Sequence, residues 1–308
     1  MTLDHDGVLH PALLARTQTF RQIITASESN SSVTMVYPDR IGPFRLEAEI
    51  GRGGMGIVYR AWDQDLHRWV AIKQMLPHLA ADPVSRQRFL REARGMATIE
   101  QHPHLIPVYM VGDEGDSPYL VMPYLQGQSL DRRLPPGRRL AVRPAVKIAR
   151  QSLAGLAAAH SAGLIHRDVK PSNLFLECQS CGRVRRVRVV DLGLARPATD
   201  LLSSQSNAMG TPLFMSPEQH QNQPLDDRTD VFSAGLVLFQ MLTGRHPFDV
   251  SSILTLSYSV VHEPHPAALS LNPRVPRLVS QLLDDMLAKI PTARPTAAAA
   301  AAALRTMS

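Results

Sequence analysis

Cysteine is nearly absent from this sequence: only Cys178 and Cys181 occur among 308 residues. Two cysteines are too few for the disulfide framework of a small secreted domain, and they are consistent with a reducing compartment. The first ten residues, MTLDHDGVLH, carry acids where a secretory signal needs positive charge, and no apolar stretch follows them. The sequence therefore predicts a cytoplasmic protein.

Long apolar runs are also missing. Nowhere do about 18 consecutive apolar residues occur, so we expect no membrane-spanning helix. The formal net charge is +6, but the basic residues are scattered and no aromatic residues are interleaved with them. Nucleic-acid binding is therefore not expected, and a nucleotide is the simpler anionic partner. Hydrophobic residues at 44% and charged residues at 19% are typical of a folded globular protein.

The predicted secondary structure changes character along the chain. Residues 1–40 are polar and rich in Ser and Thr, and we expect them to form a flexible extension. Beyond them, apolar/polar alternation and β-rich runs predict an antiparallel sheet, whereas later segments ended by Gly163 and Gly244 predict helices. The expected strands lie at 44–50, 57–62, 69–74, 105–111, 119–125 and 183–188, and the expected helices at 145–162 and 230–243.

One helix is expected among these strands, because the dipeptide Asp-Pro at 82–83 is typical of a helix start. Phe89, Glu92 and Met96 recur at i, i+3 and i+7, which places an acid on the apolar face of that helix. Lys73 lies on an apolar strand, where an unpaired ammonium would be costly. We therefore expect Glu92 to pair with Lys73, either to serve a bound phosphate or for the fold alone.

Glycines gather in GRGGMGIV at 51–58, where one predicted strand turns back into the next. Because glycine has no Cβ, backbone N–H groups in such a turn can approach phosphate oxygens. No helix follows directly, as a dinucleotide-binding loop would require, and no Lys-Ser or Lys-Thr follows, as a Walker loop would require. On this pattern alone, a phosphate-binding turn and an ordinary β-turn both stay open.

An ordered set of motifs continues from this loop to the end of the chain. It comprises GRGGMGIV, VAIK ending at Lys73, Glu92, HRDVKPSN at 166–173, Asp191 to Gly193, Ser216 to Glu218, Asp230 in DVFSAG, and Arg294. The set resembles that of the eukaryotic-type Ser/Thr protein kinases, in the form found in bacteria, and it spans about residues 41–304. The resemblance implies an α+β, bilobal protein kinase fold with ATP in the cleft: an N-terminal antiparallel sheet plus one helix, and a larger, mostly helical C-terminal lobe. The implied boundaries are an extension at 1–40, an N-lobe at 41–125 and a C-lobe at 126–308.

The resemblance also implies the chemistry, which is transfer of the γ-phosphate of Mg-ATP to Ser or Thr hydroxyls of protein substrates. Asp168 would orient the attacking hydroxyl and accept its proton, and Lys170 would neutralise the γ-phosphate. Asn173 and Asp191 would be the metal ligands, because oxygen ligands suit Mg²⁺, for which Mn²⁺ is a substitute.

Nucleotide contacts are implied in the same way. Lys73, paired with Glu92, would hold the α- and β-phosphates. Adenine would use the carbonyl of Pro123 and the N–H of Leu125, and a proline is tolerable there because only its own N–H is lost. The full set of implied nucleotide contacts is Gly51, Gly53, Gly56, Val58, Ala71, Lys73, Met122, Pro123, Leu125 and Phe175.

Regulation is implied by Arg167, which we interpret as a buried cation in the cleft with no acidic neighbour in sequence. In kinases of this kind, such an arginine pairs with a phosphate on the activation segment, here 191–218. We therefore expect autophosphorylation within this segment, with self-association as a route to it; ordinary polar serines are the alternative. The positions of Lys170 and Thr211 resemble those of the same residue types in the Ser/Thr-specific branch of the family. The candidate phosphorylation sites are Ser203, Ser204 and Ser206.

The sequence departs from the family at 178–182, CQSCG, where a tight hairpin is usual. Two cysteines are only half of a zinc site, so an inert hairpin tip, a metal shared with a partner and a redox pair are all open. Leu192 replaces the usual Phe and would be an apolar plug beside Met96 and His166. The main alternative function is a pseudokinase scaffold that binds partners without phosphoryl transfer, and a small-molecule kinase is the second.

Overall fold

The computed structural model describes residues 39–114, 117–178, 183–192 and 212–307. The extension expected at 1–40 lies outside these residues except for its last two. The other expected residues that lie outside the described part of the chain are Cys181, Gly193, Ser203, Ser204, Ser206 and Thr211.

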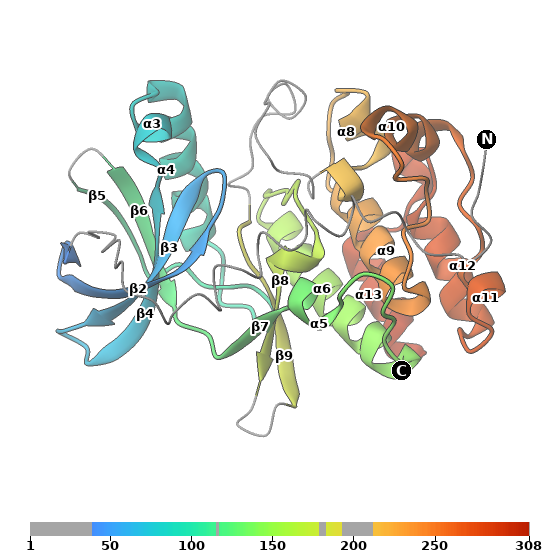
Figure 1. Ribbon diagram of the computed structural model, residues 1–308, viewed down its shortest axis with the longest axis horizontal. Coiled ribbons are helices and arrows are strands. Elements are labelled where there is room, and N and C mark those ends of the chain that lie inside the picture. Colours follow the sequence, from blue (N-terminus) through green and yellow to red (C-terminus); the bar gives the residue numbers. More distant parts are fainter. Residues whose placement is uncertain (1–38, 115–116, 179–182, 193–211, 308) are drawn as a thin grey trace, which may run out of the picture. The chain divides into compact units, whose positions relative to one another are not determined.

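A six-stranded antiparallel sheet opens the described chain, in the strand order β1-β2-β3-β4-β6-β5 (Figure 1). Its register brings Val58 opposite Lys73 and Ala71 opposite Met122. The sheet predicted from alternation is therefore confirmed. The strands are β1 Arg40–Ile41, β2 Phe44–Arg52, β3 Gly56–Asp63, β4 Arg68–Met75, β5 Met110–Glu114 and β6 Ser117–Pro123.

The strand expected at 105–111 is wrong over most of its length, because β5 begins only at Met110. Pro107 lacks the N–H that a ladder position needs. Leu105 instead forms a parallel bridge with Val189, and the N–H of Ile106 donates to the carbonyl of Val189 at 3.1 Å. The segment 99–109 thus connects the six-stranded sheet to a later part of the chain.

Two helices follow β4, the four-residue α3 Pro77–Ala80 and the longer α4 Pro83–Ala97, which contacts β5 and β6. Asp82 caps α4 as predicted, since its carboxylate accepts the N–H of Ser85 at 2.9 Å. Phe89, Glu92 and Met96 are all buried, so the predicted inward face of this helix is confirmed.

The rest of the described chain is mostly helical. Gly163 and Gly244 have φ of 75° and 77° and end α6 and α9, as predicted. Both long helices belong to the main hydrophobic core and contact each other. The helices are α5 Leu130–Arg133, α6 Val142–Ser161, α8 Pro217–His220, α9 Arg228–Thr243, α10 Ile253–His262, α11 Ala268–Leu271, α12 Arg277–Met286 and α13 Ala297–Thr306, with 3₁₀ turns η2 Pro171–Asn173, η3 Pro212–Phe214 and η4 Pro291–Ala293.

A small three-stranded sheet, β7 Gly127–Ser129, β8 Leu174–Cys178 and β9 Val184–Val189, lies within this helical part. β8 and β9 are antiparallel neighbours, and Cys178 lies opposite Val184 at the described end of the pair. The predicted Val/Arg strand is confirmed, since Val187 and Val189 are buried and Arg185 is exposed. Within the described residues, every helix is too short or too polar to cross a lipid bilayer.

Candidate active site

The first turn of α9 positions the segment that contains HRDVKPSN. Asp230 is fully buried, and its carboxylate accepts the backbone N–H groups of His166 and Arg167, both at 2.8 Å. Its Oδ2 also lies 2.7 Å from Nε2 of His160 on α6. Arg167 has φ of 66°, a backbone conformation that is unfavourable for a residue with a Cβ. The two bonds to Asp230 hold this conformation in place.

Asp168 lies at the centre of a cluster with two other predicted residues. Its Oδ2 is 2.7 Å from Nζ of Lys170, and the Nδ2 amide of Asn173 donates to the same oxygen at 3.1 Å. That amide also donates to the backbone carbonyl of Asp168 at 2.8 Å, and Asn173 is the last residue of the 3₁₀ turn η2. The three side chains come from six consecutive residues, and these bonds fix them relative to one another.

Lys73 and Asp191, which are 118 residues apart in sequence, form an ion pair with Nζ and Oδ1 at 2.7 Å. Asp191 has φ of 59°, so this residue too has left-handed backbone. Desolvation by the surrounding protein raises the pKa of Asp191. The interactions with Lys73 and, to a smaller extent, with His166 and Lys170 lower it by a larger amount, so the pKa of Asp191 lies below its usual value. Lys170 therefore acts on both Asp168 and Asp191.

The expected pairing of Lys73 with Glu92 is wrong. Glu92 is buried as predicted, but its Oε2 has no hydrogen-bond partner among the described residues. Burial raises the pKa of Glu92 from 4.5 to about 7, and nearby arginines, Arg167 first, only partly oppose this. The helix period predicts which face of α4 points inward, but the partner of Lys73 depends on how the helix packs against the sheet. The ionised Asp191 is a better counter-charge than a desolvated glutamate.

The description of Arg167 as a buried cation is also wrong. Arg167 is exposed, and its guanidinium is close enough to Glu92 to lower the pKa of the Glu92 carboxyl group. The neighbour comes from α4, far away in sequence, so no sequence pattern could reveal it. The backbone carbonyl of Arg167 also accepts the Nε2 amide of Gln219 at 2.8 Å, which connects this segment to α8.

The predicted nucleotide contacts lie mainly on the six-stranded sheet. Ala71 and Met122 are buried and paired across β4 and β6, and Gly51 pairs with Val58 across β2 and β3. At Gly56 a Cβ would lie 2.4 Å from the carbonyl oxygen of Gln74, so only glycine fits there.

Three other predicted nucleotide contacts have different settings. Gly53 donates its N–H to the carbonyl of Gly56 at 2.9 Å, which closes the turn, but a Cβ on Gly53 would meet nothing within 4 Å. Leu125 follows β6 and is partly buried. Phe175 is half-buried on β8, opposite Ser129, and so belongs to the small sheet.

The side chains of Asn173 and Asp191 have the donor atoms that a hard divalent cation prefers. Both side-chain hydrogen bonds of Asn173 to described residues are made through Nδ2, which leaves Oδ1 as an acceptor, and Asp191 uses its own Oδ1 for Lys73. The described residues contain no cluster of three or more His, Cys, Asp or Glu side chains suited to a metal. A cation held here would therefore need further oxygens from a phosphate group, as is usual for Mg²⁺.

The sequence did not predict the ion pair between Glu218 and Arg294, although both residues belong to quoted motifs. Nη1 and Nη2 of Arg294 lie 2.6 and 2.8 Å from the two carboxylate oxygens of Glu218. Arg294 also lies over the ring of Phe232 at 4.8 Å. The residue Ser216, which replaces the family's usual Ala, begins α8 with a complete capping box. Together these contacts hold α8, and with it Gln219, against the rest of the helical part.

Cys178 is the one member of the CQSCG motif that the structure describes. It is a free cysteine, partly buried, and its Sγ donates to the carbonyl of Leu176 at 3.3 Å. The other members lie outside the described residues, so the three alternatives for this motif stay predictions. Leu192 is buried and shares a cavity lining with Met96, which agrees with the predicted apolar plug.

Comparison with known proteins gives a consistent result. The family model for the protein kinase domain matches residues 44–304. A probable serine/threonine-protein kinase, pknA2 of Bifidobacterium longum, is 36% identical over 265 residues, which are 85% of this chain and 34% of that protein. Serine/threonine-protein kinase PrkC of Bacillus subtilis is 32% identical over 251 residues, which are 81% of this chain and 38% of that protein.

Among solved structures, the PknI kinase domain of Mycobacterium tuberculosis superposes with a TM-score of 0.66 at 26% identity. The superposition covers 86% of this chain and 95% of that domain. The chain thus spans between 34% and 39% of the first curated relatives, but nearly the whole of an isolated domain.

Proposed function

Since the chain belongs to the protein kinase family, we propose that it transfers the γ-phosphate of ATP to serine or threonine hydroxyls of protein substrates. The α+β, bilobal kinase fold expected from the sequence is confirmed. The names of the curated relatives support serine and threonine as acceptors. Because the chain spans little more than a third of those relatives, its substrates and partners are part of this proposal.

The observation that carries the proposal is the cluster around Asp168. Phosphoryl transfer requires an oriented nucleophile and neutralised phosphate charge, with little covalent help from the protein. In the proposed roles, Asp168 orients the hydroxyl and accepts its proton, while Lys170, 2.7 Å away, neutralises the γ-phosphate. Asn173 fixes the Asp168 carboxylate through the bond to Oδ2.

The second part of the proposal concerns the phosphates and the metal. Asn173 and Asp191 would hold Mg²⁺, which supplies charge neutralisation between phosphate groups when bound. Lys73 would bind phosphate oxygens beneath the turn that Gly51, Gly53 and Gly56 form. The buried pair Ala71 and Met122 supports an apolar wall for the adenine base, with Val58, Pro123, Leu125 and Phe175 as the remaining contacts.

Regulation and location are further parts of the same proposal. The exposed guanidinium of Arg167 suits a phosphorylated residue of the activation segment, with Ser203, Ser204 and Ser206 as the candidates and self-association as the route. Thr211 would support the Asp168 cluster. We also propose a cytoplasmic location, on the basis of the scarcity of cysteine, and a role in signalling, on the basis of the kinase family.

The test is incubation with radiolabelled ATP and Mg²⁺, with and without a generic Ser/Thr protein substrate. We expect the wild-type chain to label itself or the substrate, and Asp168→Asn and Lys73→Met to label neither. Asp285→Asn, at an exposed position on α12, is the matched control and should behave as wild type. If wild type and Asp168→Asn are equally inert while both still bind ATP, the chain is a pseudokinase scaffold.

A further inference from the structure

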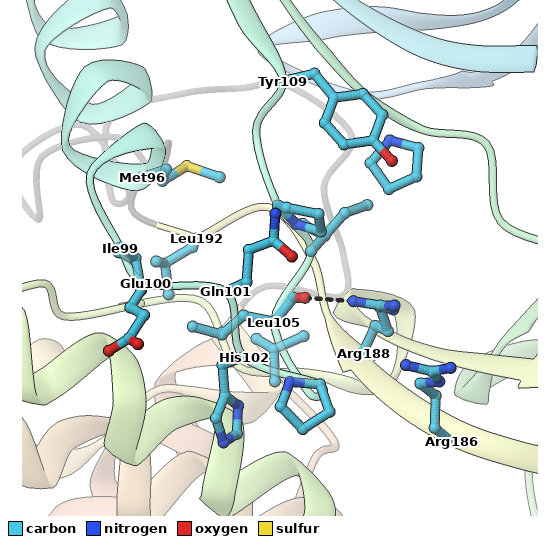
Figure 2. Close-up of a pocket in the computed structure, with 15 residues that line it drawn as sticks. Met96, Ile99, Glu100, Gln101, His102, Leu105, Tyr109, Arg186, Arg188 and Leu192 are labelled. Atoms are coloured by element: carbon cyan, nitrogen blue, oxygen red, sulfur yellow. Dashed lines mark hydrogen bonds between the residues drawn. The ribbon is translucent and has the colours of Figure 1, made fainter. Parts of the chain in front are cut away.

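A cavity of about 280 Å³ lies between the end of α4, the segment 99–109 and β9 (Figure 2). Its volume is close to the lower end of the range for small-molecule sites, roughly 300 to 1,000 Å³. None of the nucleotide contacts predicted above lines it except Pro123. The residues used below are Met96, Ile99, Leu105, Leu192, Arg186 and Arg188, and we call this the β9 cavity.

One wall of the β9 cavity is apolar. Met96, Leu105 and Leu192 are buried hydrophobic residues, and Ile99 is partly buried. Figure 2 shows Met96, Ile99 and Leu192 grouped on the side of the cavity nearest α4. This wall would remove an apolar group of a ligand from water, which is favourable by about 25 cal/mol for each Å² of apolar surface.

The opposite wall is basic. Arg186 and Arg188 project from β9, and Figure 2 shows both on the side away from Glu100. Arg185, Arg186 and Arg188 share a single carboxylate, Glu177, at 3.6, 3.2 and 3.2 Å. Three guanidinium groups on one carboxylate leave an excess of positive charge beside the cavity.

These arginines also keep donor groups for a ligand. Arg188 uses Nε for Glu177 and Nη1 for the carbonyl of Leu105 at 2.8 Å, which the dashed line in Figure 2 marks. Arg186 contacts Glu177 through Nε at 3.2 Å. Among the described residues, no partner takes up Nη2 of Arg188 or either Nη of Arg186. A carboxylate or phosphate can accept such groups in pairs.

We propose that the β9 cavity binds a small organic anion, with its carboxylate or phosphate on Arg186 and Arg188 and its apolar body against Met96, Ile99 and Leu192. The cavity shares only Pro123 with the proposed ATP contacts, and the binding does not depend on phosphoryl transfer.

Occupancy of the cavity would reach the active site through two neighbours. Leu192 follows Asp191 directly, and Met96 lies one helical turn after Glu92 on α4. A ligand against Leu192 would hold it in its present buried position, and therefore hold Asp191 on Lys73. Because that pair competes with phosphate for Lys73, ligand and ATP should each weaken the binding of the other.

The probes are phenylacetate and phenyl phosphate, with neutral phenylacetamide as the isostere, followed by ligand-observed NMR in the absence of ATP. We expect both anions to bind with dissociation constants on the order of 1 mM, and phenylacetamide to bind at least about tenfold more weakly because it lacks the charge-assisted bonds. Equal binding of the neutral and charged probes, or no binding of either anion at 10-fold that concentration, would overturn the proposal.

Variants locate the site. Arg186→Gln should weaken anion binding about tenfold, whereas Arg185→Gln, which removes a guanidinium from the same strand and the same Glu177, should leave it unchanged. Ile99→Phe places a larger side chain in the cavity and leaves both arginines intact, and it should also weaken anion binding. Unchanged thermal melting of each variant shows that it folds. If Arg186→Gln and Arg185→Gln behave alike, the anion binds elsewhere and the assignment is wrong.

The coupling is measured by titrating a fluorescent ATP analogue with and without saturating phenylacetate. We expect about a fivefold weaker affinity for the analogue when the anion is present. An unchanged or tighter affinity would overturn the link through Leu192. All of these measurements are of binding, so they can fail while phosphoryl transfer is intact, and succeed if transfer is absent.

Discussion

Two buried glutamates, Glu92 on α4 and Glu218 on α8, have opposite surroundings. Both carboxylate oxygens of Glu218 are matched by Arg294, and Thr229 donates to Oε1 at 2.6 Å. These bonds outweigh desolvation, and the pKa of Glu218 is lowered. Glu92 has arginines nearby, but its Oε2 has no direct partner in the described part of the chain, and burial raises its pKa to about 7. A buried acid therefore stabilises the structure only where its partner has matching geometry.

The difference follows the two parts of the fold. Glu218 fixes α8 within the helical part, where Ser216 and Gln219 add further bonds and carry the restraint to Arg167. Glu92 lies on α4, the one long helix among the described residues of the sheet-rich part, and α4 has a charged contact with β5 through the pair Arg86 and Asp113. The helical part is thus held by buried, satisfied contacts, and α4 by weaker ones.

The largest expected effect concerns Glu218, whose two carboxylate oxygens are both hydrogen-bonded. Arg294→Leu leaves Glu218 buried without its partner, and we expect it to lower the free energy of unfolding by about 3–5 kcal/mol. Urea unfolding at pH 7.5 measures this. Arg277→Leu, at an exposed position on α12, should cost less than about 0.5 kcal/mol. If the two substitutions cost the same, the Glu218–Arg294 pair does not stabilise the fold.

The next effect concerns Glu92 and depends on pH. Since the folded-state pKa is raised from 4.5 to about 7, the folded protein holds this proton more tightly. Its contribution to stability is fully present below about pH 4.5 and is lost as pH rises through about 7. Glu92→Gln cannot ionise, so at pH 8 we expect it to be more stable than wild type by on the order of 2 kcal/mol, allowing for solvent screening.

Unfolding titrations of wild type and Glu92→Gln between pH 5 and 8 test this, with Glu100→Gln as an exposed control. Parallel curves for all three proteins would contradict the account of Glu92. The pH dependence of stability has the opposite sign for Glu218, because the pKa of Glu218 is lowered in the folded protein. Its contribution to stability is present above its unfolded-state pKa and is lost as pH falls through its folded-state pKa.

A smaller effect is expected at the start of α8. Ser216 is buried, its Oγ accepts the N–H of Gln219, and its own N–H donates to Oε1 of Gln219 at 3.0 Å. Ser216→Ala removes the cap of the helix that carries Glu218, which should cost about 1 kcal/mol. Thermal unfolding measures the loss, and Ser251→Ala, at an exposed loop position, should melt as wild type does. A cost near zero would mean that Glu218 alone holds α8.

The smallest effect is at the surface contact of α4. Nη2 of Arg86 lies 2.7 Å from both oxygens of Asp113, but both side chains are partly exposed to solvent. A double-mutant cycle with Arg86→Gln and Asp113→Asn should give a coupling free energy of about 0.2–1 kcal/mol that falls in high salt. A coupling as large as that of Glu218 with Arg294 would remove the distinction between the two parts of the fold.

Features that depend on neighbours in sequence were predicted well. Asp82 caps α4, glycines at 163 and 244 end α6 and α9, and the inward face of α4 is as expected. Each of these depends on a backbone preference or on the period of 3.6 residues, which operate over a few positions. The members of the Asp168 cluster were named from the resemblance of their motif to that of protein kinases, and they meet because they lie within one short segment.

Features that depend on contacts between residues far apart in sequence were not predicted. The strand expected at 105–111 was displaced, because Val189 of β9 takes up the carbonyl of His104 and the N–H of Ile106. The pair of Glu218 with Arg294 joins residues 76 apart, and neither motif indicates the other as a partner. The β9 cavity likewise arises only where α4, the segment 99–109 and β9 meet.

By itself, the sequence indicated the family, most strands of the six-stranded sheet, the start and the inward face of α4, and the ends of α6 and α9. Only the tertiary structure decided that Lys73 pairs with Asp191, that Glu92 is left with a raised pKa, and that Arg167 is exposed beside it. The physical reason is distance: an ion pair requires its atoms within about 4 Å, and such precision across 118 residues depends on the packing of whole elements.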